Sequence, residues 1–350
     1  MLSHIIVILW CVAIYIPIAR MRDQIGRAVV LNTKHLVLSG GSMRGFAHMG
    51  CINDIVRVCP DFLNQLNMIS FSSAGCVAGL CCAFNFLDLE RWVSTYDLTK
   101  VLADTNVERL FDRVIGWTEW GIKKFGGKRN NDFFADDGIG LRLFIRTLIK
   151  YVSGLYMPTL KELNDAIYKI RNKEITLVIY ATNMDVRKCD AITHLTHPAV
   201  LVEDAFMATM AIPFLFPPVY INDVMYVDGG AIMNVPTPKF HIDEMLYLRL
   251  RTNICYCNNF RNNALEYVYR LFEVLFDGQL ESLFHYSPEV IRRIISIECD
   301  AGGLSDYAKT GIGNIHAIFD SGTQAFRAYC LSPLIITLIS AKMWNKDHFC

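Results

Sequence analysis

The sequence predicts an α/β fold in which a mainly parallel sheet carries helices on its faces. Short apolar runs alternate with longer segments whose apolar residues recur at helical spacing, and this β-α-β-α order is typical of such sheets. The runs are apolar throughout, as in strands that are covered on both sides. With 350 residues, the chain is long enough for one large α/β unit or for about two domains.

The first β-α-β-α unit lies near the N-terminal end of the predicted fold. The run HLVLS at 35–39 predicts a buried strand, and the apolar residues between 46 and 56 fall at helical spacing. A second strand is predicted at 68–71, and an apolar helix follows at 76–84. A turn rich in glycine and serine joins each strand to its helix.

Further elements extend this unit. Strands are predicted at 175–181 and 245–250, with a helix at about 200–210 between them. Residues 225–227 lead into an Asp-Gly-Gly loop. Residues 251–350 are predicted to be mostly helical, because apolar residues recur there at helical spacing, and to pack on or extend the preceding domain.

The charge balance and the composition exclude several classes of protein. Lys plus Arg and Asp plus Glu number 34 each, so the net charge is zero and gives no general attraction for nucleic acid. Hydrophobic residues make up 53% and charged residues 19%, which excludes a disordered chain. The 12 cysteines contain no CxxC pair, and no His, Asp or Glu cluster has ligand spacing. We therefore expect no metal and no cofactor.

Residues 1–21 form a separate hydrophobic segment. Residues 5–19 carry no charge, and Arg20, Arg22 and Arg27 follow them. The uncharged run spans about 22 Å as a helix, against about 30 Å of hydrocarbon, so only the whole segment reaches the full width. This predicts an N-terminal hydrophobic helix that anchors the chain by a single pass, with the next domain on the cytoplasmic side. A cleaved signal peptide and a buried or interfacial helix are the alternatives.

The turn Ser39-Gly40-Gly41-Ser42-Met43-Arg44-Gly45 lies between the first strand and its helix. Its glycines allow a ligand to approach the backbone closely, and the free N–H groups of a helix start favour negative charge. Such a turn can hold a phosphate or a transient oxyanion. The Gly-Lys-Ser/Thr of a phosphate loop is missing, and Ser42 occupies a position where a dinucleotide fingerprint needs glycine.

Two further turns carry reactive side chains. Ser73 lies between the second strand and its helix, where a nucleophilic serine would be exposed, although serine is also a common helix cap. Asp228 follows a strand and precedes two glycines, where it is either a catalytic carboxylate or part of an ordinary turn. The occurrence of all three turns in this order favours a catalytic interpretation.

This combination resembles the patatin-like phospholipase family, which carries a GGGxRG turn, a GxSxG elbow and a later DGG or DGA. The resemblance covers about 35–250. It includes Ala181-Thr182-Asn183, the segments at 208–213 and 216–219, and Asn234-Val235-Pro236. It implies a three-layer α/β/α fold with a mainly parallel central sheet. It also implies hydrolysis of lipid acyl esters, of the phospholipase or lysophospholipase type, with membrane lipids as partners and no nucleic acid.

The resemblance also implies a role for each matching residue. Ser73 would be the nucleophile that forms an acyl-enzyme, and Asp228 would be the general base of a two-residue dyad. Backbone N–H groups around the glycine-rich turn would form the oxyanion hole. The motif residues are Gly40, Gly41, Ser42, Met43, Arg44 and Gly45 of the turn, Phe71, Ser72, Ala74 and Gly75 of the elbow, and Gly229 and Gly230 of the DGG motif.

Two positions depart from the family pattern. Ser42 replaces the third glycine of the turn, which is tolerable if this residue does not need a positive φ. Phe71 replaces the first glycine of the elbow, where a bulky ring would distort the nucleophile or fill the space of a substrate chain. The alternative function is therefore a catalytically inactive lipid-binding or scaffold protein.

A third interpretation is a Ser-His-Asp hydrolase, which would take its base from one of four histidines. These are His241, His285, His316 and His348. For His48, in the helix after the glycine-rich turn, we expect a packing or capping role.

Overall fold

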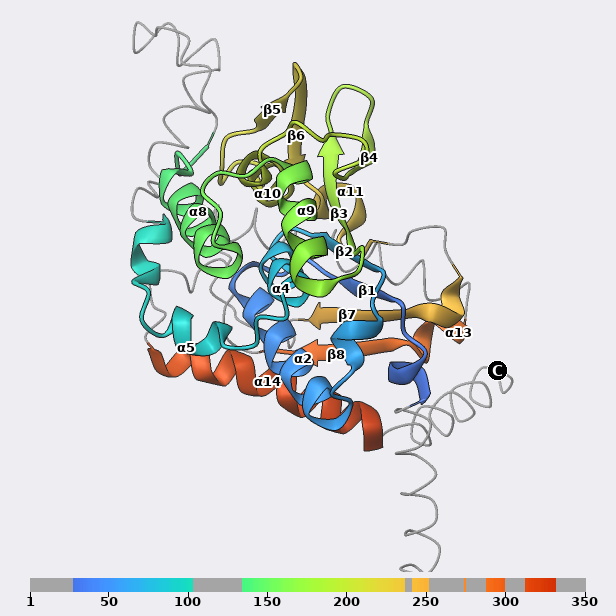
Figure 1. Ribbon diagram of the computed structural model, residues 1–350. Helices are drawn as coiled ribbons and strands as arrows, with labels where there is room; N and C mark the ends of the chain where they lie inside the picture. Colours follow the sequence, from blue (N-terminus) through green and yellow to red (C-terminus); the bar gives the residue numbers. More distant parts are fainter. Residues whose placement is uncertain are drawn as a thin grey trace, which may run out of the picture.

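The computed structural model describes residues 28–102, 134–236, 241–251, 274, 288–299 and 312–331 (Figure 1). An eight-stranded sheet forms its centre, in the order β5-β6-β3-β2-β1-β7-β8, with β4 paired to β3. The strands are β1 His35–Leu38, β2 Met68–Ser72, β3 Thr176–Asn183, β4 Lys188–Ile192, β5 Val219–Ile221, β6 Val224–Asp228, β7 Met245–Arg251 and β8 Ile294–Glu298. The neighbouring strands β3, β2, β1, β7 and β8 pair in parallel. The strands β4, β5 and β6 join the sheet by antiparallel pairs.

Helices and short helical turns connect these strands. They are η1 Ser42–Gly45, α2 Phe46–Val58, α3 Phe62–Gln65, α4 Gly75–Ala83, α5 Leu89–Val93, η2 Leu98–Leu102, α8 Ile139–Ser153, α9 Leu160–Arg171, α10 Val202–Met210, α11 Gly230–Met233, η3 Ile242–Glu244, α13 Pro288–Ile291 and α14 Ile312–Leu331.

Both faces of the sheet are buried. Leu36 and Leu38 of β1 belong to the large core cluster that includes α2, α4, α8, α10 and α14. Val37 points to the other face and packs with Met245 and Tyr247 of β7 in a second, smaller cluster. The predicted α/β class with a mainly parallel central sheet is therefore confirmed.

The sequence predicted some strands and missed others. The strands expected at 35–39, 68–71, 175–181 and 245–250 are β1, β2, β3 and β7. The short strands β4, β5 and β8 were not expected. β8 lies in the part that was predicted to be mostly helical, and it extends the sheet beyond β7. It is a half-exposed edge strand of five residues, too short to give a clear apolar pattern.

The pairing around β3 brings two strand ends together. Ile179 and Tyr180 pair with both β2 and β4, so these strands lie on opposite edges of β3. Residues 181–183 pair with both β4 and β6, so β6 shares an edge with β2. β2 ends opposite Tyr180, and β6, which runs the other way, ends opposite Ala181. The two strands therefore meet head-on.

Helix α14 packs closely against α2 (Figure 1). A Cβ on Gly50 of α2 would lie 1.9 Å from the Phe319 carbonyl oxygen, and one on Gly322 would lie 1.9 Å from the Ala47 carbonyl oxygen. The rings of Phe46 and Phe319 stack at 6.1 Å beside this crossing. Because both obstacles are backbone atoms, only glycine fits at the two positions.

The N-terminal segment 1–21, with its predicted anchor, lies outside the described residues. Among the helices that the structure does describe, none combines the length and the apolar character needed to cross a bilayer.

We expect Gly50→Ala or Gly322→Ala to lower the free energy of unfolding by about 1–3 kcal/mol, because the added methyl group would force the two helices apart. Thermal or urea unfolding would measure this change. Gln324→Ala, at an exposed position of α14, is the matched control and should change stability by less than about 0.5 kcal/mol. Equal stability of the glycine variants and the control would contradict the close packing of α2 and α14.

Candidate active site

Ser73 occupies a tight turn between β2 and α4. Its φ is +49°, in the left-handed region that non-glycine residues rarely adopt. Holding a residue there costs on the order of 1 kcal/mol or more, and such strain is common at functional sites. The turn places the hydroxyl of Ser73 just before the first residue of α4.

The hydroxyl of Ser73 donates a hydrogen bond to Asp228, with 2.7 Å between Oγ and Oδ2. Asp228 is 2% exposed, and the Gly230 N–H donates to its other oxygen, Oδ1, at 2.7 Å. One carboxylate oxygen is thus held by the backbone, and the other faces the serine. Asp228 has its pKa raised to about 7 by burial, while the hydrogen bonds from Ser73 and Gly230 oppose this rise. The carboxyl group can therefore exchange a proton near neutral pH.

No histidine that the structure describes makes a hydrogen bond to Ser73 or Asp228. His316 of α14 binds Glu90 of α5, and His241 precedes η3. His285 and His348 lie outside the described residues. The ring of His48 is buried, with Nε2 2.9 Å from the Ser39 carbonyl oxygen. It supports the glycine-rich turn, as expected.

Several hydrogen bonds orient the peptide groups of the glycine-rich turn. The Gly40 N–H donates to the Asn234 carbonyl oxygen at 3.0 Å, and Arg44 Nε donates to the Gly41 carbonyl oxygen at 3.1 Å. Arg44 therefore fixes the turn. Within the described part of the chain, the N–H groups of Gly41 and Ser42 have no acceptor, so both are available to bind an oxyanion. The Gly40 N–H is not available, because it already donates to Asn234.

The turn and the elbow are in direct contact. A Cβ on Gly40 would lie 2.9 Å from Ser73 Cβ, and one on Gly45 would lie 2.7 Å from Ala74 Cβ. Ser42 has a φ of +57°, so this position does require the left-handed conformation. The condition under which serine was expected to be tolerable, that this residue does not need a positive φ, is therefore not met. Ser42 carries the strain that the family's glycine avoids.

The ring of Phe71 lies in the core, although a ring at this position was expected to disturb the elbow or occupy the substrate space. It is fully buried and meets Phe206 of α10 edge to face, at 5.6 Å between ring centroids. A Cβ on Gly79 of α4 would lie 2.5 Å from Phe71 Cδ1. The ring fits because residue 79, on the neighbouring helix α4, is a glycine and leaves space for it.

Thr209 supports the strained turn. Its Oγ1 accepts a hydrogen bond from the Ser73 N–H at 2.8 Å and donates one to the Tyr180 carbonyl oxygen at 2.5 Å. Its own carbonyl oxygen accepts from the Gly229 N–H at 3.3 Å. One residue thus connects the elbow, β3 and the Asp228 loop. This role of Thr209 was not predicted, although the residue lies in the segment at 208–213 that resembles the family.

An apolar pocket opens beside the elbow and the glycine-rich turn. It holds about 330 Å³ of empty space, part of it open to solvent. Residues from η1, α2, α4, η2, α8 and α10 line it, among them Ser42, Ala74, Leu141, Phe144 and Met210. No charged side chain of the described residues lines this pocket. Nor does any group of three His, Cys, Asp or Glu residues in the described ranges have an arrangement suited to a metal ion.

A known protein family matches most of the chain that carries this site. The family model described as patatin-like phospholipase matches residues 36–241. The chain belongs to the patatin-like phospholipase family. The resemblance predicted from the sequence motifs is thereby confirmed.

Two viral proteins are relatives of this patatin-like chain. Uncharacterized protein R571 of Acanthamoeba polyphaga mimivirus is 25% identical over 212 residues, which are 60% of this chain and 62% of the relative. Probable lipid hydrolase 463L of Invertebrate iridescent virus 6 is 25% identical over 213 residues, which are 59% of this chain and 64% of the relative. The chain thus matches less than two thirds of the length of each.

The patatin-like fold is also found in the crystal structure of VipD from Legionella pneumophila. The TM-score is 0.51 with 15% sequence identity, over 85% of this chain and 67% of the VipD chain. At this identity the likeness concerns the fold alone.

We expect Thr209→Val to lower the free energy of unfolding by about 2 kcal/mol, because the Ser73 N–H and the Tyr180 carbonyl would lose their partner. Any esterase activity should fall about tenfold or more, since the elbow would relax. Thr209→Ser keeps the hydroxyl and is the matched control, with stability and activity near those of the natural protein. Denaturant unfolding and ester hydrolysis would measure both effects, and a valine variant equal to the serine variant would contradict this role.

Proposed function

We propose that this chain hydrolyses acyl esters of lipids, in the manner of a phospholipase or lysophospholipase, with Ser73 as nucleophile and Asp228 as general base. The observation that carries the proposal is the 2.7 Å hydrogen bond between a strained serine and a buried carboxylate. Membership of the patatin-like phospholipase family and the relative named probable lipid hydrolase support it.

The reaction would proceed through an acyl-enzyme. Ser73 Oγ attacks the ester carbonyl carbon while its proton passes to Asp228. The N–H groups of Gly41 and Ser42 stabilise the oxyanion, and each donor of this kind contributes on the order of 3 kcal/mol. The tetrahedral intermediate collapses, and the leaving alcohol takes the proton from Asp228. Water then attacks the acyl-enzyme by the same steps and releases the fatty acid.

The pocket favours an acyl chain over a polar substrate. Its lining is apolar apart from Ser42, and Ala74 places it directly next to the nucleophile. An ester carbonyl held at Ser73 would therefore direct its hydrocarbon chain into this space. The predicted anchor at residues 1–21 complements this function, because it would keep the domain at a membrane, on the cytoplasmic side, where lipid esters lie.

The packing of Phe71 favours an enzyme over an inactive lipid-binding or scaffold protein. The ring occupies core space between α4 and α10 and does not line the pocket. With Phe71 in this place, Ser73 has the left-handed backbone conformation described above, which supports the proposal.

The first test is covalent labelling of the full chain in detergent with a fluorophosphonate probe, together with hydrolysis of a soluble ester. Ser73→Ala should abolish labelling and lower hydrolysis by about 10³-fold or more. Asp228→Asn should lower both by about 10²- to 10⁴-fold. Far-UV circular dichroism would show that the variants are folded.

Phe71→Gly is the informative comparison in the same assay. It should open a core cavity, cost about 3–5 kcal/mol of stability and leave labelling no higher than in the natural protein. An unlabelled natural protein that gains labelling in Phe71→Gly would favour the inactive alternative. No labelling in any folded variant would contradict the hydrolase.

The pH dependence follows from the raised pKa of Asp228. Burial disfavours the ionised carboxylate, and only this form can take the serine proton, so activity should be lost at acidic pH. We expect kcat/KM to fall about tenfold per pH unit below a pKa of about 7 and to be constant above it. The residual activity of Asp228→Asn should not show this fall in kcat/KM below neutral pH. A natural protein with a flat profile through neutral pH would contradict the role of Asp228 as base.

A further inference from the structure

One wall of the apolar pocket is formed by helix α8. Leu141 and Phe144 lie three residues apart on α8, are 2% and 3% exposed, and both line the pocket. Leu98 and Val101 of η2 extend this wall. A hydrocarbon chain that enters the pocket from the elbow would therefore contact α8, and the place of this helix determines how much of the chain fits.

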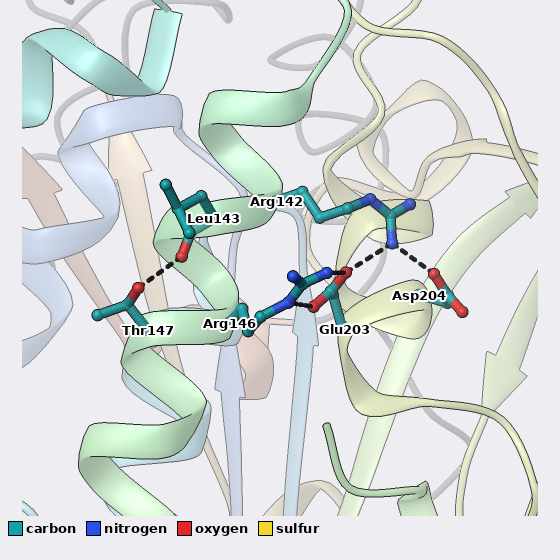
Figure 2. A network of polar contacts seen from close by, with 6 residues as sticks. All are labelled: Arg142, Leu143, Arg146, Thr147, Glu203 and Asp204. Carbon is teal, nitrogen blue, oxygen red and sulfur yellow. Dashed lines mark hydrogen bonds and ion pairs between the residues drawn. The ribbon is translucent and has the colours of Figure 1, made fainter. Parts of the chain in front are cut away.

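A buried carboxylate and two partly exposed arginines hold α8 against α10 (Figure 2). Glu203 of α10 is 1% exposed and accepts three hydrogen bonds from α8. Arg146 donates from Nε to Oε2 at 2.6 Å and from its terminal nitrogen to Oε1 at 2.9 Å, and Arg142 donates to Oε1 at 2.8 Å. Arg142 also binds Asp204 at 2.6 Å. Arg142, Arg146, Glu203 and Asp204 are the α8–α10 charge cluster.

The cluster connects the pocket wall to the nucleophile. Arg142 and Arg146 are one helical turn apart and bind α10, whereas Leu141 and Phe144 lie roughly 150° further round the same rigid helix. Helix α10 carries Glu203 near its start and Thr209, which holds the Ser73 turn, near its end. Moving α8 away from α10 would leave the Glu203 carboxylate buried without partners, which is strongly unfavourable. The cluster thus fixes the distance between the elbow and the wall.

We propose that Leu141 and Phe144 set the acyl chain length that the enzyme accepts, and that Glu203 is a positioning residue that holds them in place. This inference rests on the proposed function and concerns the substrate class of the same site. The apolar lining begins at Ala74, beside the nucleophile, and is closed on one side by Leu141 and Phe144 of α8. The structure therefore favours esters with short to medium acyl chains over long ones.

The test compares p-nitrophenyl butyrate, octanoate, laurate and palmitate with the full chain in detergent. The natural protein should have its highest kcat/KM with octanoate. Leu141→Ala and Phe144→Ala should each raise the ratio of kcat/KM for laurate to that for octanoate by about tenfold, since the truncated wall admits more methylene groups. Using both variants keeps the test valid if one of them fails to fold.

Glu203→Gln tests the positioning role. It keeps the size of the side chain but removes the charge, and we expect it to reduce the octanoate preference over butyrate about tenfold, chiefly through KM. A residue that only stabilised the fold would leave this ratio unchanged. Asp165→Asn, which removes an exposed ion pair with Lys161 on α9, is the matched control and should keep the natural profile.

The outcomes separate the two proposals. Butyrate hydrolysis that requires Ser73, together with chain-length profiles unchanged in Leu141→Ala and Phe144→Ala, would overturn the inference and leave the proposed hydrolase in place. Absence of both fluorophosphonate labelling and butyrate hydrolysis in the natural protein would overturn both.

Discussion

The geometry of the candidate site depends on the head-on meeting of β2 and β6 along one edge of β3. Ser72 pairs with Tyr180 and Asp228 pairs with the next residue, Ala181, so the ladder of β3 sets the spacing of the two strand ends. The serine and the carboxylate are 155 residues apart in the chain, yet their oxygens lie 2.7 Å apart. Since backbone pairing holds both ends, the close approach of Ser73 and Asp228 is set by the register of the sheet.

Around this meeting point, close backbone contacts and a few hydrogen bonds hold conformations that would otherwise be unfavourable. Ser73 and Ser42 both have positive φ. Thr209 accepts a hydrogen bond from the Ser73 N–H. Arg44 donates to the carbonyl oxygen of Gly41, the residue that precedes Ser42. A Cβ on Gly229 would lie 2.2 Å from the Tyr180 carbonyl oxygen, which shows how closely the Asp228 loop approaches β3. The same close packing removes water from Asp228 and raises its pKa.

The chain departs from its family where neighbouring residues can compensate. Phe71 replaces an elbow glycine, and the space for its ring is provided by Gly79 and Phe206 on the covering helices. Ser42 has no such compensation, because its backbone keeps the left-handed conformation. Side-chain packing can adjust to Phe71, whereas no side chain can change the backbone conformation that the turn imposes on Ser42.

The sequence alone predicted the α/β class, four of the parallel strands, the family, and the serine and the aspartate that the structure brings into hydrogen-bond contact, because apolar runs and motif spacings are local properties of the chain. The tertiary structure decided what depends on distant neighbours. These are the edge strand β8, the direction of the Phe71 ring, the engagement of the Gly40 N–H, the role of Thr209 and the charge cluster that holds α8 to α10. Each of these features joins residues far apart in the chain, so no local pattern of residues records it.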